Sequence, residues 1–127
     1  MLGQMASITK KITEEDITVF SQISLDVNPV HLDDEFAKKT IFEKRIAHGF
    51  LVGSLISAVI ANKLPGVGSI YLKQELNFKR PVFIGDQITA EVEVIEIVKP
   101  TVYRLATRCI NQEGHVVIDG YAIIKKA

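Results

Sequence analysis

One segment limits the possible folds of this chain more than any other: the run HGFLVGSLISAVIANKL, residues 48–64. Apolar residues fall on nearly every side of a helix drawn through it, and such a helix has to be enclosed by the rest of the protein. Gly49, Gly53 and Ser57 recur at four-residue spacing, which predicts a ridge of small residues that a sheet can approach closely. The sequence therefore predicts a buried central helix.

The chain after this helix has the two-residue period of strands. In residues 69–79 apolar Ile70, Leu72, Leu76 and Phe78 alternate with polar residues, which predicts a half-buried strand. Residues 88–94 alternate again, and the phase slips at Val94–Ile95, which indicates a β-bulge. Two more strand-like runs cover residues 101–110 and 116–126. One enclosed helix followed by three or four long antiparallel strands predicts an α+β fold, with the sheet wrapped around the helix.

The first half of the chain is expected to be helical. Thr13 precedes three acidic residues, the arrangement of an N-cap, and apolar residues then recur at three-residue spacing to about Ser24. Pro29 ends the helical pattern, because it lacks an amide hydrogen and pushes the residue before it out of the helical region. A shorter helix near Asp33 to Lys39 and an irregular segment, residues 40–47, are predicted to follow.

Length and charge favour one domain, residues 1–127, and exclude several classes of partner. The 15 basic and 15 acidic residues are dispersed along the chain, so the basic face of a nucleic-acid-binding protein is absent. The sequence has neither an apolar run of signal-peptide type nor a segment long enough to span a membrane. The single cysteine, Cys109, permits no internal disulfide, which fits a cytoplasmic protein.

The segment DVNPVH, residues 26–31, holds the first candidate catalytic residues. Asp26 and His31 combine a carboxylate with an imidazole of near-neutral pKa, the pair that general acid–base catalysis needs. Asn28 is expected to close the loop through a hydrogen bond to the backbone. On spacing alone, a local cap or a surface hydrogen bond explains this pair at least as well.

A second candidate element is the start of the central helix at His48–Gly49. The free amides of a first helical turn stabilise negative charge, including that of a thioester enolate oxygen. Gly49 leaves room for a ligand carbonyl, although a glycine there also permits tight packing. His48 is a candidate ligand contact, and its alternative is a histidine that satisfies the local backbone.

These residues carry a resemblance to a known family. Residues 20–57, from FSQISLDVNPVH to HGFLVGSLIS, and residues 64–94 closely resemble the MaoC-like, R-specific enoyl-CoA hydratases. The D-x-N-P-x-H core and the downstream H-G-x-L helix start stand in the family's order and spacing. The resemblance implies a hot-dog fold, in which an antiparallel sheet wraps a long central helix. It also implies addition of water to a trans-2-enoyl-CoA to give an R-3-hydroxyacyl-CoA.

The resemblance also implies roles for individual residues. Asp26 and His31 would hold and activate the water, and Gly49 would donate its backbone N–H to the thioester oxygen. Ser57 falls where the family often has a hydroxyl bonded to the catalytic carboxylate, and would orient Asp26. The chain departs from the family in having Ser24–Leu25 before the aspartate, where a glycine or glutamate is usual.

The remaining expectations concern the substrate. Lys79 and Arg80 are the leading candidates to bind the phosphates of coenzyme A, with a solvated strand end as the alternative. Ile60 is expected to form the floor of the acyl pocket, and its branched side chain favours short acyl chains. No cofactor is expected, because coenzyme A is part of the substrate. The three histidines are scattered without the spacing of metal ligands.

Two other functions remain open. One is a hot-dog acyl-CoA thioesterase, against which residues 49–62 count because they contain no carboxylate. The other is a non-catalytic acyl-CoA-binding subunit, which would be expected to lose Asp26 or His31. In each case the apolar content of 47% and the open edge of a single wrapped sheet favour a homodimer or higher homo-oligomer.

Overall fold

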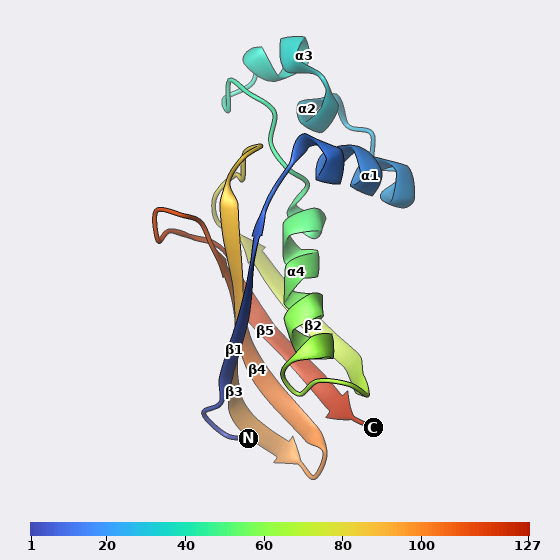
Figure 1. Cartoon of the computed structure of the whole chain (residues 1–127), viewed down its shortest axis with the longest axis vertical. Helices are drawn as coiled ribbons and strands as arrows, with labels where there is room; N and C mark the ends of the chain where they lie inside the picture. Colours follow the sequence, from blue (N-terminus) through green and yellow to red (C-terminus); the bar gives the residue numbers. More distant parts are fainter.

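A five-stranded antiparallel sheet and one long helix dominate the computed structural model, which describes residues 1–127 (Figure 1). The elements in chain order are β1 (Met5–Lys11), α1 (Glu14–Ser24), α2 (Pro29–Leu32), α3 (Asp34–Lys38), α4 (Gly49–Asn62), β2 (Ser69–Phe78), β3 (Gln87–Lys99), β4 (Val102–Ile110) and β5 (Val116–Lys126). The strand order is β1-β3-β4-β5-β2. Helix α4 lies along one face of this sheet, and α1, α2 and α3 gather beyond its N-terminal end. The predicted α+β class is confirmed.

The core lies between α4 and the inner face of the sheet. Alternate residues of β3 are fully buried and face the helix, as the two-residue period predicted. They pack with one stripe of α4 that includes Val52, Ile56 and Val59. Burial of this apolar surface is the main stabilising contribution to the fold.

The opposite stripe of α4 is open, contrary to the expectation of a helix enclosed on every side. Phe50 is 70% exposed, and Ser54, Ser57 and Ala61 are exposed as well. The sheet of one chain covers only one side of the helix, so apolar residues on the other side stay in contact with solvent. No helix of the chain combines the length and the apolar character needed to cross a bilayer.

Small residues let β2 approach α4 closely, as their spacing predicted. A Cβ atom added to Gly49 would lie 2.5 Å from Cε1 of Phe78, and one added to Gly53 would lie 3.2 Å from Cδ1 of Leu76. A larger residue at either position would therefore require the facing side chain of β2 to shift.

Register shifts interrupt the pairing in three of the four strand pairs. The shift between β3 and β4 at Val94 to Glu96 confirms the bulge expected from the sequence. A second shift, at Tyr71 to Lys73 of β2, was not expected. Of the four apolar residues expected on one buried face of this strand, only Leu76 packs partly against the core, and Ile70, Leu72 and Phe78 are exposed.

The first half of the chain is helical only in part. Thr13 caps α1 in a reciprocal arrangement with Asp16, which confirms the predicted helix start. Residues 5–11, however, form the edge strand β1, paired with β3. Their apolar alternation is weak because several exposed positions of this edge strand carry Lys, Ser or Thr, so the pattern of residues did not indicate a strand there.

Candidate active site

The loop between α1 and α2 positions Asp26. Helix α1 ends at Leu25, which adopts the left-handed conformation with φ 67° and donates its backbone N–H to Ser21. The Asp26 carboxylate accepts the N–H of Asn28, and the Asn28 side chain accepts the N–H of Val30. These two local bonds fold the loop tightly, as expected for Asn28, and leave the Asp26 side chain exposed.

His31 lies on α2 with 8% of its surface exposed. Its Nδ1 is 2.8 Å from the backbone oxygen of Ile46. Because a carbonyl oxygen can only accept, Nδ1 must carry the hydrogen, and the neutral ring then has its lone pair on Nε2. One hydrogen bond therefore fixes both the orientation of His31 and the nitrogen that can act as a base.

His48 lies beneath these two residues with only 2% of its surface exposed. Its Nε2 is 3.1 Å from the backbone oxygen of Asp26 and 3.1 Å from Oγ of Ser21. Its ring stacks on His31, with centroids 3.9 Å apart and planes inclined by 29°. Burial lowers the pKa of His48 below the usual value of a histidine, so the ring is held neutral.

One side-chain donor atom from each of Asp26, His31 and His48 lies within 4.8 Å of the others. This spacing alone would suit a metal ion. The two imidazoles stack face to face, however, so their in-plane lone pairs run side by side and do not converge on a common point. The arrangement suits proton transfer between a carboxylate and an imidazole.

The N-terminus of α4 begins next to this cluster. His48 is the N-cap residue, but its side chain makes no capping hydrogen bond, so the first amides of α4 are available to a ligand. Gly49 is the first residue of the helix, and the ring of Phe78 lies over the place that a Cβ would take. An oxyanion at this point would be stabilised by N–H groups and by the positive end of the helix dipole.

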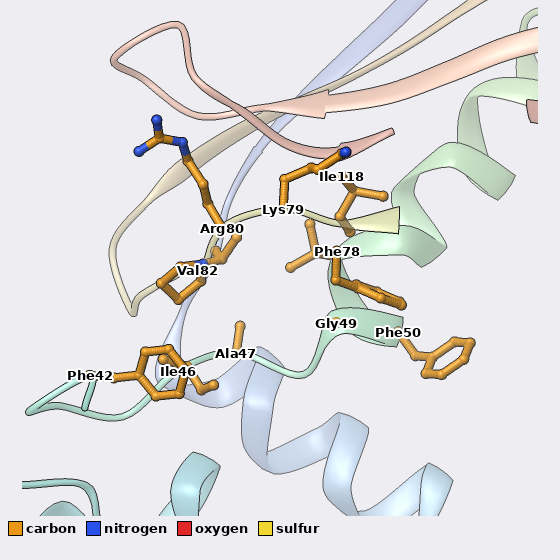
Figure 2. Close-up of a pocket in the computed structure, with 12 residues that line it drawn as sticks. Phe42, Ile46, Ala47, Gly49, Phe50, Phe78, Lys79, Arg80, Val82 and Ile118 are labelled. Atoms are coloured by element: carbon orange, nitrogen blue, oxygen red, sulfur yellow. The ribbon is translucent and has the colours of Figure 1, made fainter. Parts of the chain in front are cut away.

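A cavity of about 490 Å³ opens on the other side of Gly49 (Figure 2). Its lining is mostly apolar and consists of Phe42, Ile46, Ala47, Gly49, Phe50, Val52, Phe78, Lys79, Arg80, Pro81, Val82 and Ile118. Lys79 and Arg80 come from the segment that faces Phe42 and Ile46 across the cavity. The cavity therefore combines apolar walls with two cations, a combination that suits a ligand with an apolar body and anionic groups.

Asp26 and His31 do not line this cavity. The segment Ile46–Gly49 lies between the pair and the cavity: the Ile46 backbone oxygen holds His31, and the Ile46 side chain lines the cavity. Gly49 takes part in both, through its place at the helix start and in the cavity lining. The pair and the cavity thus meet at the first turn of α4.

Two predicted site residues lie elsewhere. Ser57 is exposed on the open stripe of α4, about 12 Å along the helix from Gly49, and makes no hydrogen bond to Asp26 within the chain. Ile60 is 1% exposed in the core and does not line the cavity. Within one chain, Ser57 does not orient Asp26, and Ile60 does not form the floor of this cavity.

Several residues of the site were missed in the sequence. Ser21 is buried on α1 and bonds to His48, and Phe20 packs its ring 4.9 Å from that of His48. Phe78 and the backbone oxygen of Ile46 are the others. Ser21 and Phe20 follow the helical spacing of α1, so only their tertiary contacts reveal them, and a backbone oxygen leaves no signal in a sequence.

Comparison with known proteins agrees with this geometry. The chain is 45% identical over 126 residues to the (R)-specific enoyl-CoA hydratase of Aeromonas caviae, covering 98% of this chain and 93% of that one. It is 42% identical over 125 residues to the 3-hydroxybutyryl-CoA dehydratase of Methylorubrum extorquens, covering 98% and 79%. The solved structure of the unliganded R-hydratase PhaJ1 from Pseudomonas aeruginosa superimposes with a TM-score of 0.94 at 50% identity, covering 99% and 81%.

The resemblance carried by the motifs around Asp26, His31 and Gly49 is confirmed by a family model. The model described as "MaoC like domain" matches residues 3–109, which include Asp26, His31, His48 and the start of α4. The hot-dog arrangement of sheet and central helix agrees with the superposition on R-hydratase structures. On this evidence the chain belongs to the MaoC-like domain family.

Proposed function

We propose that this protein adds water to trans-2-enoyl-CoA thioesters and gives R-3-hydroxyacyl-CoA, in a reaction that also runs in reverse. The observation that carries the proposal is the placing of Asp26 beside His31, whose Nε2 lone pair is left free by the bond to Ile46. The R-hydratase and 3-hydroxybutyryl-CoA dehydratase names of relatives at 42–45% identity support the same reaction.

Proton transfer is assigned to this pair. His31 Nε2 accepts a proton from a water molecule whose other hydrogen is held by the Asp26 carboxylate. The oxygen of the water bonds to C3 of the substrate, and the imidazolium returns its proton to C2. The enzyme is then unchanged, and because one pair serves both steps, hydrogen and hydroxyl enter on the same face. A pair of this kind typically contributes about 10²–10⁴-fold to the rate.

Charge stabilisation is assigned to Gly49. As water adds to C3, negative charge collects on the thioester oxygen, and the uncapped N–H of Gly49 donates to it. Loss of one donor of this type typically costs about 2.7–4 kcal/mol of transition-state stabilisation. Asn28, in the loop that holds Asp26, would donate a hydrogen bond to the substrate. Its side-chain oxygen accepts the N–H of Val30, which leaves its NH₂ group free.

The cavity is assigned to the coenzyme A part of the substrate. Its apolar walls suit the pantetheine arm, and Lys79 and Arg80, which are among its lining residues, would bind the phosphates. No separate cofactor takes part, since the acid, the base and the oxyanion donor all come from the chain. We also propose a cytoplasmic location, which the single cysteine supports.

A homodimer is part of the proposal. The exposed stripe of α4 and the unpaired edge of β2 lie on adjoining parts of the chain, and Ile70, Leu72 and Phe78 of β2 are exposed apolar residues. A second copy placed there would cover both. The orienting role expected of Ser57 would then require a contact between copies, which light scattering and a Ser57→Ala variant of the oligomer would test.

Two absorbance measurements on one crotonyl-CoA sample test the reaction. Loss of the conjugated double bond without release of free thiol, and an R-3-hydroxy product by chiral chromatography, are the expected results. Release of thiol would instead establish a thioesterase. Binding with neither change would establish a non-catalytic module, and either of these outcomes would overturn the proposal.

A further inference from the structure

We propose that His48 is a positioning residue that holds Asp26 and His31 in their reactive arrangement; this role rests on the function proposed above. The sequence left two roles open for His48, contact with the ligand and satisfaction of the local backbone. Its 2% exposure and its absence from the cavity lining place it behind the catalytic pair instead.

The first contact of His48 fixes the Asp26 loop. The backbone oxygen of Asp26 can only accept, so His48 Nε2 must carry the hydrogen and donate it. Oγ of Ser21 lies at the same distance and accepts from the same N–H. One imidazole N–H therefore joins α1, through Ser21, and the loop, through Asp26, to the start of α4.

The second contact supports His31 from behind. The His48 ring stacks against the His31 ring and is itself backed by Phe20 on α1, at 4.9 Å between centroids and 58° between planes. His31 is held in its plane by this stack and at its Nδ1 by Ile46. Rotation of the ring that would aim Nε2 away from Asp26 is opposed by both contacts.

The stack also requires His48 to be neutral. The titratable groups that face it are His31, stacked on its ring, and Asp26, whose backbone it binds. Burial favours the neutral ring, and so does the positive charge that His31 acquires during turnover. The hydrogen bond to Asp26 and the charge of Asp26 favour the protonated ring, but burial is the larger effect and the pKa of His48 stays below its ordinary value. The tautomer with hydrogen on Nε2 leaves a lone pair on Nδ1, and that atom is buried with no partner in the chain. His48 can thus donate to Asp26 without taking a proton from the reacting pair.

Two substitutions separate these contacts. His48→Gln keeps an N–H donor near the position of Nε2 and loses the stacked ring, whereas His48→Phe keeps an aromatic ring and loses the donor. A misplacement of about 1 Å in a catalytic group can cost about 10²-fold, so we expect His48→Phe to lower kcat by about that factor with KM within about twofold. His48→Gln should recover about tenfold of this loss.

The control is His115→Gln, which changes an exposed histidine in the turn before β5 and should leave kcat and KM as in the wild type. Melting temperatures of all variants are measured alongside, so that activity is expressed per folded protein. An unchanged kcat in His48→Phe, a rise in KM alone, or a His48→Gln variant no better than His48→Phe would each overturn the positioning role.

Nitrogen NMR of the wild-type imidazoles gives a readout that needs neither turnover nor a variant. The expected spectrum has His48 neutral at pH 7 with its hydrogen on Nε2. A hydrogen on Nδ1 or a protonated ring would refute the proposal even if every variant failed to fold. If wild-type protein does not hydrate crotonyl-CoA, the proposed reaction fails, and the NMR result still decides the placement of His48.

Discussion

The sheet with α4 and the helical segment, residues 14–48, are held in place by different kinds of interaction. Six residues of the helical segment are buried, and three of them, Ser21, His31 and His48, are polar. Outside the segment, Thr107 is the only polar residue in the buried set. The sheet and α4 depend on apolar packing, whereas the helical segment depends on a few directed hydrogen bonds.

Arg45 shows how the helical segment is fixed. Its side chain is 11% exposed and forms ion pairs with Glu14 of α1 and Asp34 of α3, and it also donates to the backbone oxygen of Leu32. These contacts connect α1, α2 and α3 to the irregular segment that leads into α4. The sheet with α4 therefore gives the fold its stability, and the helical segment fixes the orientation of the catalytic groups.

The largest effect in this comparison is expected from the catalytic pair. Asp26→Asn and His31→Ala should each lower kcat for crotonyl-CoA by about 10²–10⁴-fold, since each removes one member of the acid–base pair. Circular dichroism should show an unchanged fold, and Glu15→Gln, which changes an exposed carboxylate of the same helical segment, should retain activity. Near-wild-type turnover by either variant would remove that residue from the mechanism.

A substitution in the core between the sheet and α4 should lower stability and leave kcat nearly unchanged. Leu105 on β4 is fully buried in the core, and Leu105→Ala should reduce the free energy of unfolding by about 2–5 kcal/mol. Urea denaturation measures this loss. Because the site is remote from Leu105, kcat per folded molecule should stay within about twofold of wild type. A large loss of kcat would show that packing between the sheet and α4 also controls the geometry of the catalytic groups.

The rim of the cavity should affect binding more than chemistry. Lys79→Ala combined with Arg80→Ala should raise KM for the CoA ester by about tenfold and change kcat little, because contacts to phosphates act equally in the ground and transition states. Steady-state kinetics measure both constants. The pair Lys38→Ala and Lys39→Ala removes the same charge from α3 and should leave KM unaltered. A loss confined to kcat would contradict the assignment.

The end of α1 offers a smaller test. Leu25 has φ 67° and is 81% exposed, so it adopts the left-handed conformation without burying its side chain. Leu25→Gly should stabilise the protein by about 0.5–1 kcal/mol, because glycine adopts this conformation without strain. Ile23→Gly, inside α1 and 76% exposed, should destabilise it by a similar amount. If urea denaturation shows that both variants change the free energy of unfolding in the same direction, this explanation is wrong.

The smallest effect concerns pH. The pKa of His48 is lowered by burial, so below its ordinary value of 6.5 the unfolded chain binds a proton more readily than the folded protein does. The free energy of unfolding should therefore rise with pH through this window and fall as the solution is acidified. Urea denaturation of wild type and His48→Gln between pH 5 and 8 measures the difference. An equally steep dependence in His48→Gln would assign the effect to other groups.

Much of the sheet and α4 could be predicted from the sequence. The central helix, the bulge at Val94 and the long strands follow from the hydrophobic period, which depends on the chain alone. Strand β1 could not, because an exposed edge carries polar residues on both sides. The open stripe of α4 could not either, because an all-apolar helix does not say whether the same chain or a second copy covers it.

In the helical segment the sequence predicted the catalytic residues but not the contacts that hold them in place. Asp26, His31 and Gly49 stand in a recognisable motif, and the structure brings the first two together and places the third at the helix start. The contacts of His48 with Ser21 and Asp26 join residues 27 and 22 positions apart, and no local pattern encodes them. Leu25, which precedes Asp26 where the resemblance led us to expect glycine or glutamate, occupies a left-handed position that favours glycine.

Ile46 serves both sides of the site. Its side chain lines the cavity, its backbone oxygen accepts a hydrogen bond from His31, and it pairs with Phe83 in an isolated β-bridge. A ligand that displaces this residue by a fraction of an ångström moves the imidazole with it, because only one hydrogen bond separates them. How tightly the thioester is seated and how well the base is aimed are therefore properties of the same peptide unit, and a change in one cannot leave the other untouched.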